Sequence, residues 1–280
     1  MINIGPYPYN GQQFEKRLEE LKSAVVPDFN EQQMLRFILN SIDLTTLEGT
    51  DNKEVVEQLC RTAVSFKNDN KQIPSTGAVC VYPPFVSVSK RALQGTGVKV
   101  ASVAGAFPAG QSPIEIKLAE IRYALEQGAD EIDMVISRGK FLEGNYQEVY
   151  DEIRTIREIC GQATLKVILE TGELKTNNNI YKASQIAIAA GADFIKTSTG
   201  KVPVSATPEA FLVMMDAIKK HFYDTGKRVG VKVAGGVSAP ETALCYVKLL
   251  VQVLGKDWMN HSCFRIGASR LANKVYDKIR

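Results

Sequence analysis

The sequence predicts one (β/α)8 barrel, and three observations favour this fold class. Between residues 42 and 280, eight short β-like segments alternate with longer segments of helical periodicity. No composition break or low-complexity linker divides the 280 residues, so we expect one domain over residues 1–280. The rival fold, an open doubly wound sheet, lacks the GxGxxG and GxxxxGK[ST] motifs that would support it.

Two amphipathic segments open the chain and are predicted to be helices added to the barrel. Residues 14–24 read FEKRLEELKSA and residues 31–42 read EQQMLRFILNSI. Apolar residues recur three and four positions apart in both segments, which is typical of helices with one buried face. We therefore expect an N-terminal helical extension over residues 1–40.

The predicted strands are short, apolar and bounded by small or polar residues. They lie at 42–47, 78–82, 99–105, 131–137, 165–170, 193–199, 229–236 and 264–269. Predicted helix starts fall between them. Ser112, Thr207 and Ser238 are expected N-caps, because a proline follows each within two positions. Glu115 and Glu241 lie three residues after the two serines, which is the spacing of a capping box.

The composition excludes several classes of function. The net charge of +3 is too balanced to favour a nucleic-acid or membrane partner, and no apolar run reaches transmembrane length. No secretory signal is visible, and five separated cysteines suit a reducing cytoplasm. His221 and His261 are the two histidines of the chain, so we expect no histidine-rich metal site.

Ionisable residues occupy inward positions of four consecutive predicted strands. Successive side chains of a strand point to opposite faces. In segment 229–236 the alternating valines form a face for the helices, which leaves Lys232 inside. The same alternation places Asp133 and Lys166 inside, and it also places Glu170 inside at the end of the segment that contains Lys166. For Lys196 it is less decisive, although the similar stretches GADEIDM and GADFIKT align Asp133 with Lys196.

This predicted set of three lysines and one aspartate indicates amine chemistry. An unpaired buried charge costs roughly several kcal/mol, and one aspartate cannot pair with three lysines. The excess positive charge is therefore expected to lower the pKa of at least one lysine. A neutral lysine amine attacks carbonyl groups and forms a Schiff base, which can then accept electrons from an adjacent C–C bond. The alternative is that Lys196 and Asp133 form a structural ion pair.

Glycine-rich strand ends predict a phosphate site near these lysines. Backbone N–H groups of glycine-rich loops and helix N-termini bind anions, and the loops after strands seven and eight commonly do so in this fold. We expect the phosphate of a small substrate to bind among Gly200, Lys201, Gly235, Gly236, Gly267 and Ser269. Thr199 and Lys166 are expected near the site but outside the chemistry.

Several of these segments resemble the signature segments of the 2-deoxyribose-5-phosphate aldolases, a family of class I aldolases with a (β/α)8 fold. The segments DFIKTSTGK, VKVAGGV, DEIDMV, LKVILETGEL and FRIGAS carry the resemblance, which runs in order from residue 42 onward. It implies reversible cleavage of 2-deoxy-D-ribose 5-phosphate to D-glyceraldehyde 3-phosphate and acetaldehyde, without a metal or other cofactor. It further implies that Lys196 forms the Schiff base, that Lys232 lowers its pKa, and that Asp133 handles protons through water.

Some positions depart from the family pattern, and other functions stay open at this point. The chain has Val233 where a proline is frequent, Arg270 where a serine is frequent, and SVAGAFPAG at 102–110. Tyr276 does not align with the C-terminal tyrosine that some members place near the substrate. The alternatives are a transaldolase-like or isomerase activity on phosphosugars, and a catalytically silent barrel that binds a phosphorylated ligand. Homo-oligomerisation is compatible with the sequence but is not dictated by any motif.

Overall fold

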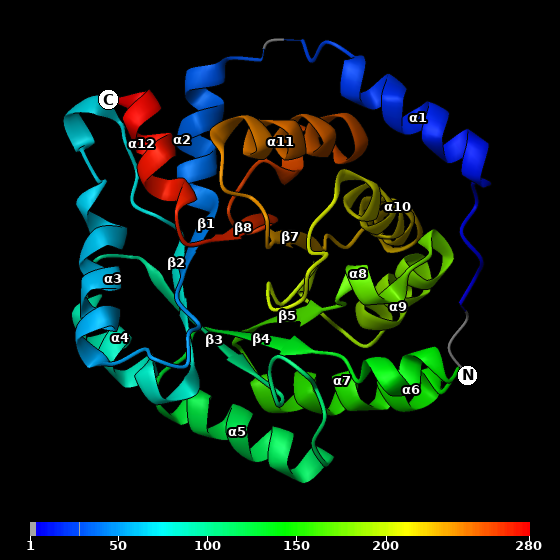
Figure 1. The fold of residues 1–280 in the computed structure, drawn as a ribbon, viewed down its shortest axis with the longest axis horizontal. Coiled ribbons are helices and arrows are strands. Elements are labelled where there is room, and N and C mark those ends of the chain that lie inside the picture. The colour runs from blue at the N-terminus through cyan, green and yellow to red at the C-terminus, as the bar shows by residue number, and fades with distance from the viewer. Residues whose placement is uncertain (1–3, 28) are drawn as a thin grey trace.

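Eight parallel strands form a closed barrel, in which β1 pairs with β8 (Figure 1). The structure is a computed structural model that describes residues 4–27 and 29–280. The predicted fold class is therefore confirmed, and each predicted strand is present. The strands are β1 (Ile42–Thr45), β2 (Ala78–Val81), β3 (Lys99–Ala104), β4 (Glu131–Val135), β5 (Thr164–Ile168), β6 (Phe194–Lys196), β7 (Gly230–Ala234) and β8 (Phe264–Ala268).

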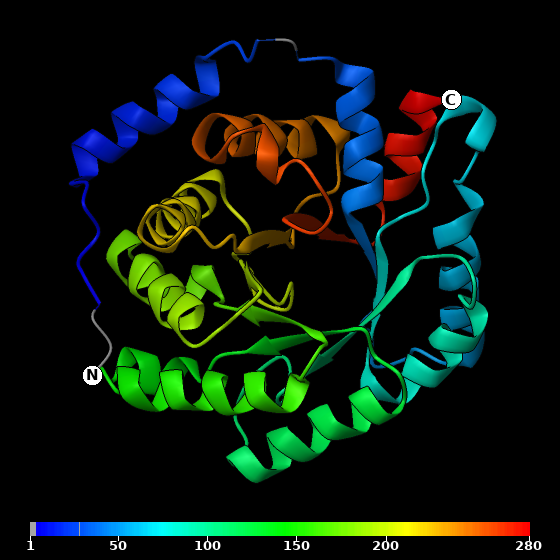
Figure 2. The same ribbon diagram turned by 180° about the vertical axis from the view of Figure 1, so that it is seen from behind.

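Helices surround the barrel on its outside, as both ribbon views show (Figures 1 and 2). Within the described residues, none of them is both long and apolar enough to span a membrane. The ring helices are α3 (Lys53–Ser65), α4 (Val86–Ala92), α5 (Ile114–Glu126), α6 (Arg138–Leu142), α7 (Tyr146–Cys160), α8 (Thr171–Leu174), α9 (Asn177–Ala189), α10 (Pro208–Thr225), α11 (Pro240–Leu254) and α12 (Leu271–Ile279). Short 3-10 turns are η1 (Asp69–Lys71), η2 (Pro83–Phe85) and η3 (Lys256–Trp258).

The two predicted N-terminal helices are present but occupy different places. Helix α1 (Gly11–Ser23) lies outside the ring, against α11 (Figure 1). Helix α2 (Glu31–Ser41) packs against α11 and α12 and leads directly into β1. Its apolar face, which includes Leu35, Ile38 and Leu39, is buried in the main core. The second helix is therefore part of the ring of helices around the barrel rather than a peripheral addition.

One of the three predicted N-caps is confirmed. The Thr207 side chain accepts a hydrogen bond from the backbone N–H of Ala210 at the start of α10. The predicted serine caps are wrong, because α5 and α11 start further along the chain. The N-cap positions are taken by Pro113 and Ala239, and neither helix has a side-chain cap. Ala239 is extended because it precedes a proline, which leaves the serine before it one residue too far from the first turn.

The barrel interior divides into an apolar part and an ionic part. The apolar part is a small cluster of buried side chains, separate from the main core between strands and helices. The ionic part lies beside it and is described below. The apolar cluster consists of Leu47, Cys80, Ala101, Val103, Phe107, Val135 and Ile168.

Helix α1 is attached to the ring by a carboxylate of α10. Arg17 donates two hydrogen bonds of 2.7 Å to Asp216, and the Tyr7 hydroxyl donates a third of 2.7 Å. We expect Arg17→Ala to lower the free energy of unfolding by about 1.5–3 kcal/mol, because Asp216 loses a bidentate charged partner. Urea unfolding measures this loss. Lys16→Ala, at an exposed neighbouring position, is the control and should change stability by less than about 0.5 kcal/mol; equal effects would contradict the attachment.

Candidate active site

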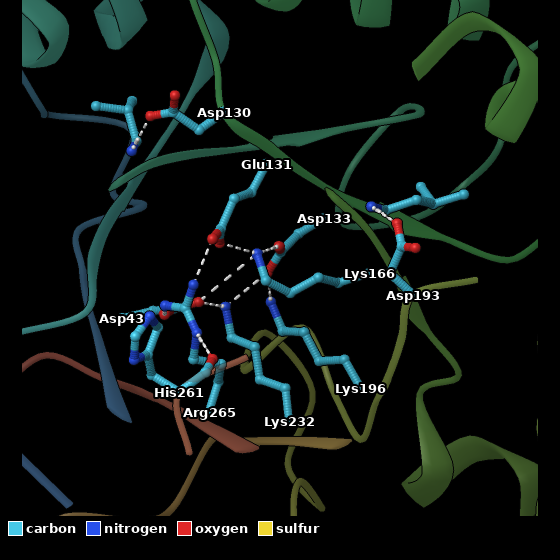
Figure 3. Close-up of polar contacts among 12 residues, drawn as sticks. Asp43, Asp130, Glu131, Asp133, Lys166, Asp193, Lys196, Lys232, His261 and Arg265 are labelled. Atoms are coloured by element: carbon cyan, nitrogen blue, oxygen red, sulfur yellow. Dashed lines mark hydrogen bonds and ion pairs between the residues drawn. The ribbon is translucent and has the colours of Figure 1, made fainter. Parts of the chain in front are cut away.

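Seven ionisable side chains meet inside the barrel, and we refer to them as the ionic cluster (Figure 3). Six different strands contribute them, and each is at most 4% exposed. Their placement follows from strand alternation, since their apolar neighbours on the same strands pack toward the helices. The members of the cluster are Asp43, Glu131, Asp133, Lys166, Lys196, Lys232 and Arg265.

Asp133 is the centre of the cluster and binds all three predicted lysines. Its Oδ1 accepts a hydrogen bond of 2.7 Å from Lys166. Its Oδ2 accepts hydrogen bonds of 2.7 Å from both Lys196 and Lys232. Two ammonium groups on one carboxylate oxygen lie close together, and Figure 3 shows both lysines reaching toward Asp133 from neighbouring strands. The structure therefore brings together the four inward residues that the sequence predicts.

Three members of the cluster were missed by the sequence analysis. Arg265 donates hydrogen bonds to Asp43 and to Glu131. Asp43 also accepts one from Lys232, and Glu131 pairs with Lys166 at 2.5 Å. Alternation could have identified them, because Asp43 and Arg265 each lie between two buried apolar residues and Glu131 is two positions before Asp133. The predicted ratio of three lysines to one aspartate is corrected to four basic groups and three carboxylates.

The electrostatics of the cluster distinguish Lys196 from its neighbours. Burial lowers the pKa of Lys196 below its ordinary value; Asp133 opposes this effect and the Lys232 ammonium reinforces it. Burial also acts on Lys166 and Lys232, but their carboxylate partners outweigh it and raise the pKa of each. With every member ionised, the cluster has one excess positive charge. A neutral Lys196 removes that excess, so the net charge of the cluster acts on the pKa of Lys196 in the same direction as burial.

The two aspartates of the cluster are held in their ionised form. Burial alone would raise the pKa of Asp133, but the adjacent lysines hold it well below its usual range. The same competition lowers the pKa of Asp43 to about 2, where Arg265 is the strongest of the cations that overcome burial. Both aspartates are therefore acceptors of hydrogen bonds, rather than donors, at neutral pH.

An open pocket of about 320 Å³ lies at the carboxyl ends of the strands, next to the cluster. Of the seven cluster residues, Lys196 lines it and the other six do not. Thr199 lines it as well, as do all six residues predicted for the phosphate: Gly200, Lys201, Gly235, Gly236, Gly267 and Ser269. An amine and a set of glycine-rich loops therefore face one space of small-molecule size.

At two of these positions the structure explains why the residue is glycine. Gly235 has a φ of +82°, and a Cβ there would lie 2.4 Å from the Cβ of Ser205. At Gly267, a Cβ would lie 3.3 Å from Cε of Lys232 and 3.0 Å from Cβ of Ala234. Gly267 thus leaves room for a cluster lysine, in addition to lining the pocket. Nζ of Lys201 donates a hydrogen bond of 3.0 Å to Oε1 of Glu48, which also lines the pocket.

Other sequence expectations fall outside the pocket. Glu170, which alternation places inside the barrel, has a left-handed backbone (φ +56°) and does not contact Lys166. Tyr276 packs against Phe66 on the outer side, with ring centroids 5.3 Å apart. Arg270, by contrast, lines the pocket. No group of three or more His, Cys, Asp or Glu side chains is arranged to hold a metal ion in residues 4–27 and 29–280.

The fold and the site define a barrel enzyme with a lysine-rich centre under a small-molecule pocket. The sequence model of the DeoC/LacD family aldolases matches residues 37–248. This chain belongs to the DeoC/LacD aldolase family.

Relatives and solved structures agree with this assignment. The chain is 46% identical to the deoxyribose-phosphate aldolase of Homo sapiens over 248 residues, which is 85% of this chain and 78% of the human protein. It is 47% identical to the enzyme of Bos taurus, with the same coverage of both chains. A solved structure of deoxyribose phosphate aldolase from Aeropyrum pernix, described as a unique tetramer, has a TM-score of 0.69 and 26% identity, and the match covers 96% of this chain and 98% of that one.

Proposed function

We propose that this protein cleaves 2-deoxy-D-ribose 5-phosphate reversibly to D-glyceraldehyde 3-phosphate and acetaldehyde through a Schiff base on Lys196. One observation carries the proposal. Lys196 is a buried lysine with a lowered pKa, and it lines a pocket whose walls are glycine-rich loops. A buried lysine whose pKa is lowered and a phosphate site at the same strand ends suit a small phosphorylated aldehyde.

The chemistry follows from the amine. Lys196 attacks the aldehyde carbon of the open-chain sugar, and loss of water leaves a protonated imine. A base removes the proton of the C3 hydroxyl, the C2–C3 bond breaks, and its electron pair moves toward the imine nitrogen to give an enamine. D-Glyceraldehyde 3-phosphate leaves with C3 as its aldehyde carbon. Protonation of C2 and hydrolysis by one water then release acetaldehyde and regenerate the free amine of Lys196.

The remaining roles are assigned by position. We assign Lys232 to lowering the pKa of Lys196, because the two ammonium groups share one oxygen of Asp133. Asp133 is assigned to proton handling through water, since its carboxylate is ionised and contacts the reacting amine. Gly200, Lys201, Gly235, Gly236, Gly267 and Ser269 are assigned to the phosphate, with Thr199 and Lys166 near the site.

The compartment, domain organisation, oligomeric state and partners of the protein are also part of the proposal. The five cysteines are free, which supports a reducing cytoplasm. Contacts of Asp216 with Arg17 and Tyr7 support treating residues 1–280 as one domain. Of the predicted extension over residues 1–40, α1 is the added part, whereas α2 belongs to the ring of helices. The tetrameric relative from Aeropyrum pernix supports homo-oligomerisation. We infer small-molecule substrates and no nucleic-acid partner.

Borohydride trapping with acetaldehyde tests the Schiff base directly. Reduction of the imine should leave an ethyl group on Lys196, which peptide mass spectrometry locates. Lys201 lines the same pocket and is the internal control, because it is exposed and paired with Glu48 and should remain unmodified. An adduct distributed over several lysines, or none on Lys196, would overturn the proposed function.

A further inference from the structure

Glu170 is a buried carboxylate outside the ionic cluster, at the start of α8. Its side chain is 0% exposed, and its backbone is left-handed, which is uncommon for a residue other than glycine. A conformation of this kind costs about 1–3 kcal/mol and persists where surrounding contacts stabilise it. The contacts of Glu170 therefore indicate what the conformation supports.

The Glu170 carboxylate binds the loop that leads from β6 into the pocket. The backbone N–H of Thr199 donates to both carboxylate oxygens, at 3.2 and 3.3 Å, and the Thr199 hydroxyl donates to Oε2 at 2.5 Å. The same hydroxyl accepts a hydrogen bond of 3.1 Å from the backbone N–H of Lys201. One carboxylate thus determines the shape of the turn 199–201, all of which lines the pocket.

The two residues after Glu170 hold the same loop. The backbone N–H of Thr171 donates to the carbonyl oxygen of Thr197 at 2.9 Å. Gly172 lies so close to the loop that a Cβ would be 2.1 Å from the carbonyl oxygen of Val204. The segment 170–172 therefore packs along the 197–204 loop and contacts it at both ends.

Arg138 connects this support to a third loop. Its guanidinium donates to Glu170 at 3.1 Å, and also to the backbone carbonyls of Pro108 and Ala109 at 3.2 and 3.0 Å. Glu173 is a second carboxylate partner of Arg138, at 3.1 Å, but it is half-exposed and accepts no hydrogen bond from Thr199. Glu173 offers a matched control for the carboxylate of Glu170.

We propose that Glu170 is a positioning residue that holds the turn 199–201 in the conformation that binds the phosphate of the substrate. It does not touch the substrate and acts through Thr199. The inference deepens the proposed function and rests on it. Replacing Glu170 by glutamine keeps the size of the side chain but places an amide N–H₂ opposite the donors of Thr199 or Arg138. The turn then loses its fixed shape while Lys196 keeps its ionic partners.

The test compares Glu170→Gln with Glu173→Gln on a phosphorylated and an unphosphorylated substrate. We expect Glu170→Gln to raise KM for 2-deoxyribose 5-phosphate by about tenfold, equivalent to the loss of roughly one charged hydrogen bond. Its kcat/KM for 2-deoxyribose, which has no phosphate, should change by less than about twofold. Glu173→Gln should resemble the wild type on both substrates. Equal losses on both substrates, or no loss, would overturn the positioning role.

A binding measurement separates this inference from the aldolase activity. Inorganic phosphate should protect the wild type and Glu173→Gln against thermal unfolding at lower concentrations than it protects Glu170→Gln. Phosphate protection can be measured even if the wild type shows no aldolase activity. Such inactivity would overturn the proposed function and would leave the positioning role of Glu170 open to this test. Should Glu170→Gln fail to fold, Thr199→Val removes the same hydroxyl contacts and should weaken phosphate protection equally; equal protection of the wild type and the folded variant would overturn the inference.

Discussion

Lys196→Met is expected to lower kcat/KM for 2-deoxyribose 5-phosphate by on the order of 10⁴-fold or more, because the reaction loses its covalent intermediate. Residual activity should show no borohydride-sensitive intermediate. The measurement is a coupled assay of D-glyceraldehyde 3-phosphate release, with wild type and variant at the same pH. Retention of more than about a tenth of the wild-type rate would exclude Lys196 as the nucleophile.

The stability of the Lys196→Met variant distinguishes a catalytic role of Lys196 from a structural one. Removing one partner of a buried structural ion pair costs about 3–5 kcal/mol. We expect Lys196→Met to cost much less, because Asp133 keeps Lys166 and Lys232, and the cluster becomes balanced at three carboxylates and three basic groups. Urea unfolding measures the difference. A variant that loses several kcal/mol of stability together with activity would favour the structural alternative.

The barrel and its pocket could be predicted from the sequence because they depend on local rules. Strand alternation identified Asp133, Lys166 and Lys232, and glycine-rich strand ends identified the pocket walls. Alternation also applies to Asp43 and Arg265, but their importance depends on which strands meet when the barrel closes. Asp43 contacts Lys232 across 189 residues of sequence, and that pairing follows from the stagger of the strands rather than from either segment alone.

Glu170 shows a second limit of sequence reasoning. Alternation along β5 places its side chain inside the barrel, yet the backbone becomes left-handed at Glu170, two residues after the strand ends. No residue type marks this turn, since glycine is the usual occupant of such a conformation. The contacts with Thr199 and Arg138 that stabilise it come from two other loops. A local sequence pattern does not contain those partners. The stabilisation of the turn 199–201 by Glu170 therefore follows from the three-dimensional structure and not from the sequence around either residue.

Lys232→Leu is the second change with a large expected effect, and its sign follows from charge. The Lys232 ammonium lowers the pKa of Lys196, so its removal should raise that pKa. A lysine with a higher pKa becomes neutral at higher pH, and the acidic limb of the pH profile of kcat/KM should therefore move to higher pH. At neutral pH we expect a loss of about 10²-fold or more, since Lys232 lies within reach of the same carboxylate as the reacting amine.

Lys201→Met is the control for the effect of charge at a distance. Lys201 lines the pocket but contacts Glu48 rather than the ionic cluster, so its loss should raise KM for the phosphorylated substrate and leave the acidic limb in place. The two variants then separate the charge that tunes the amine from the charge assigned to the phosphate. If Lys232→Leu left the acidic limb unchanged, the lowered pKa of Lys196 would have to come from burial, which is the larger of the two causes that depress it.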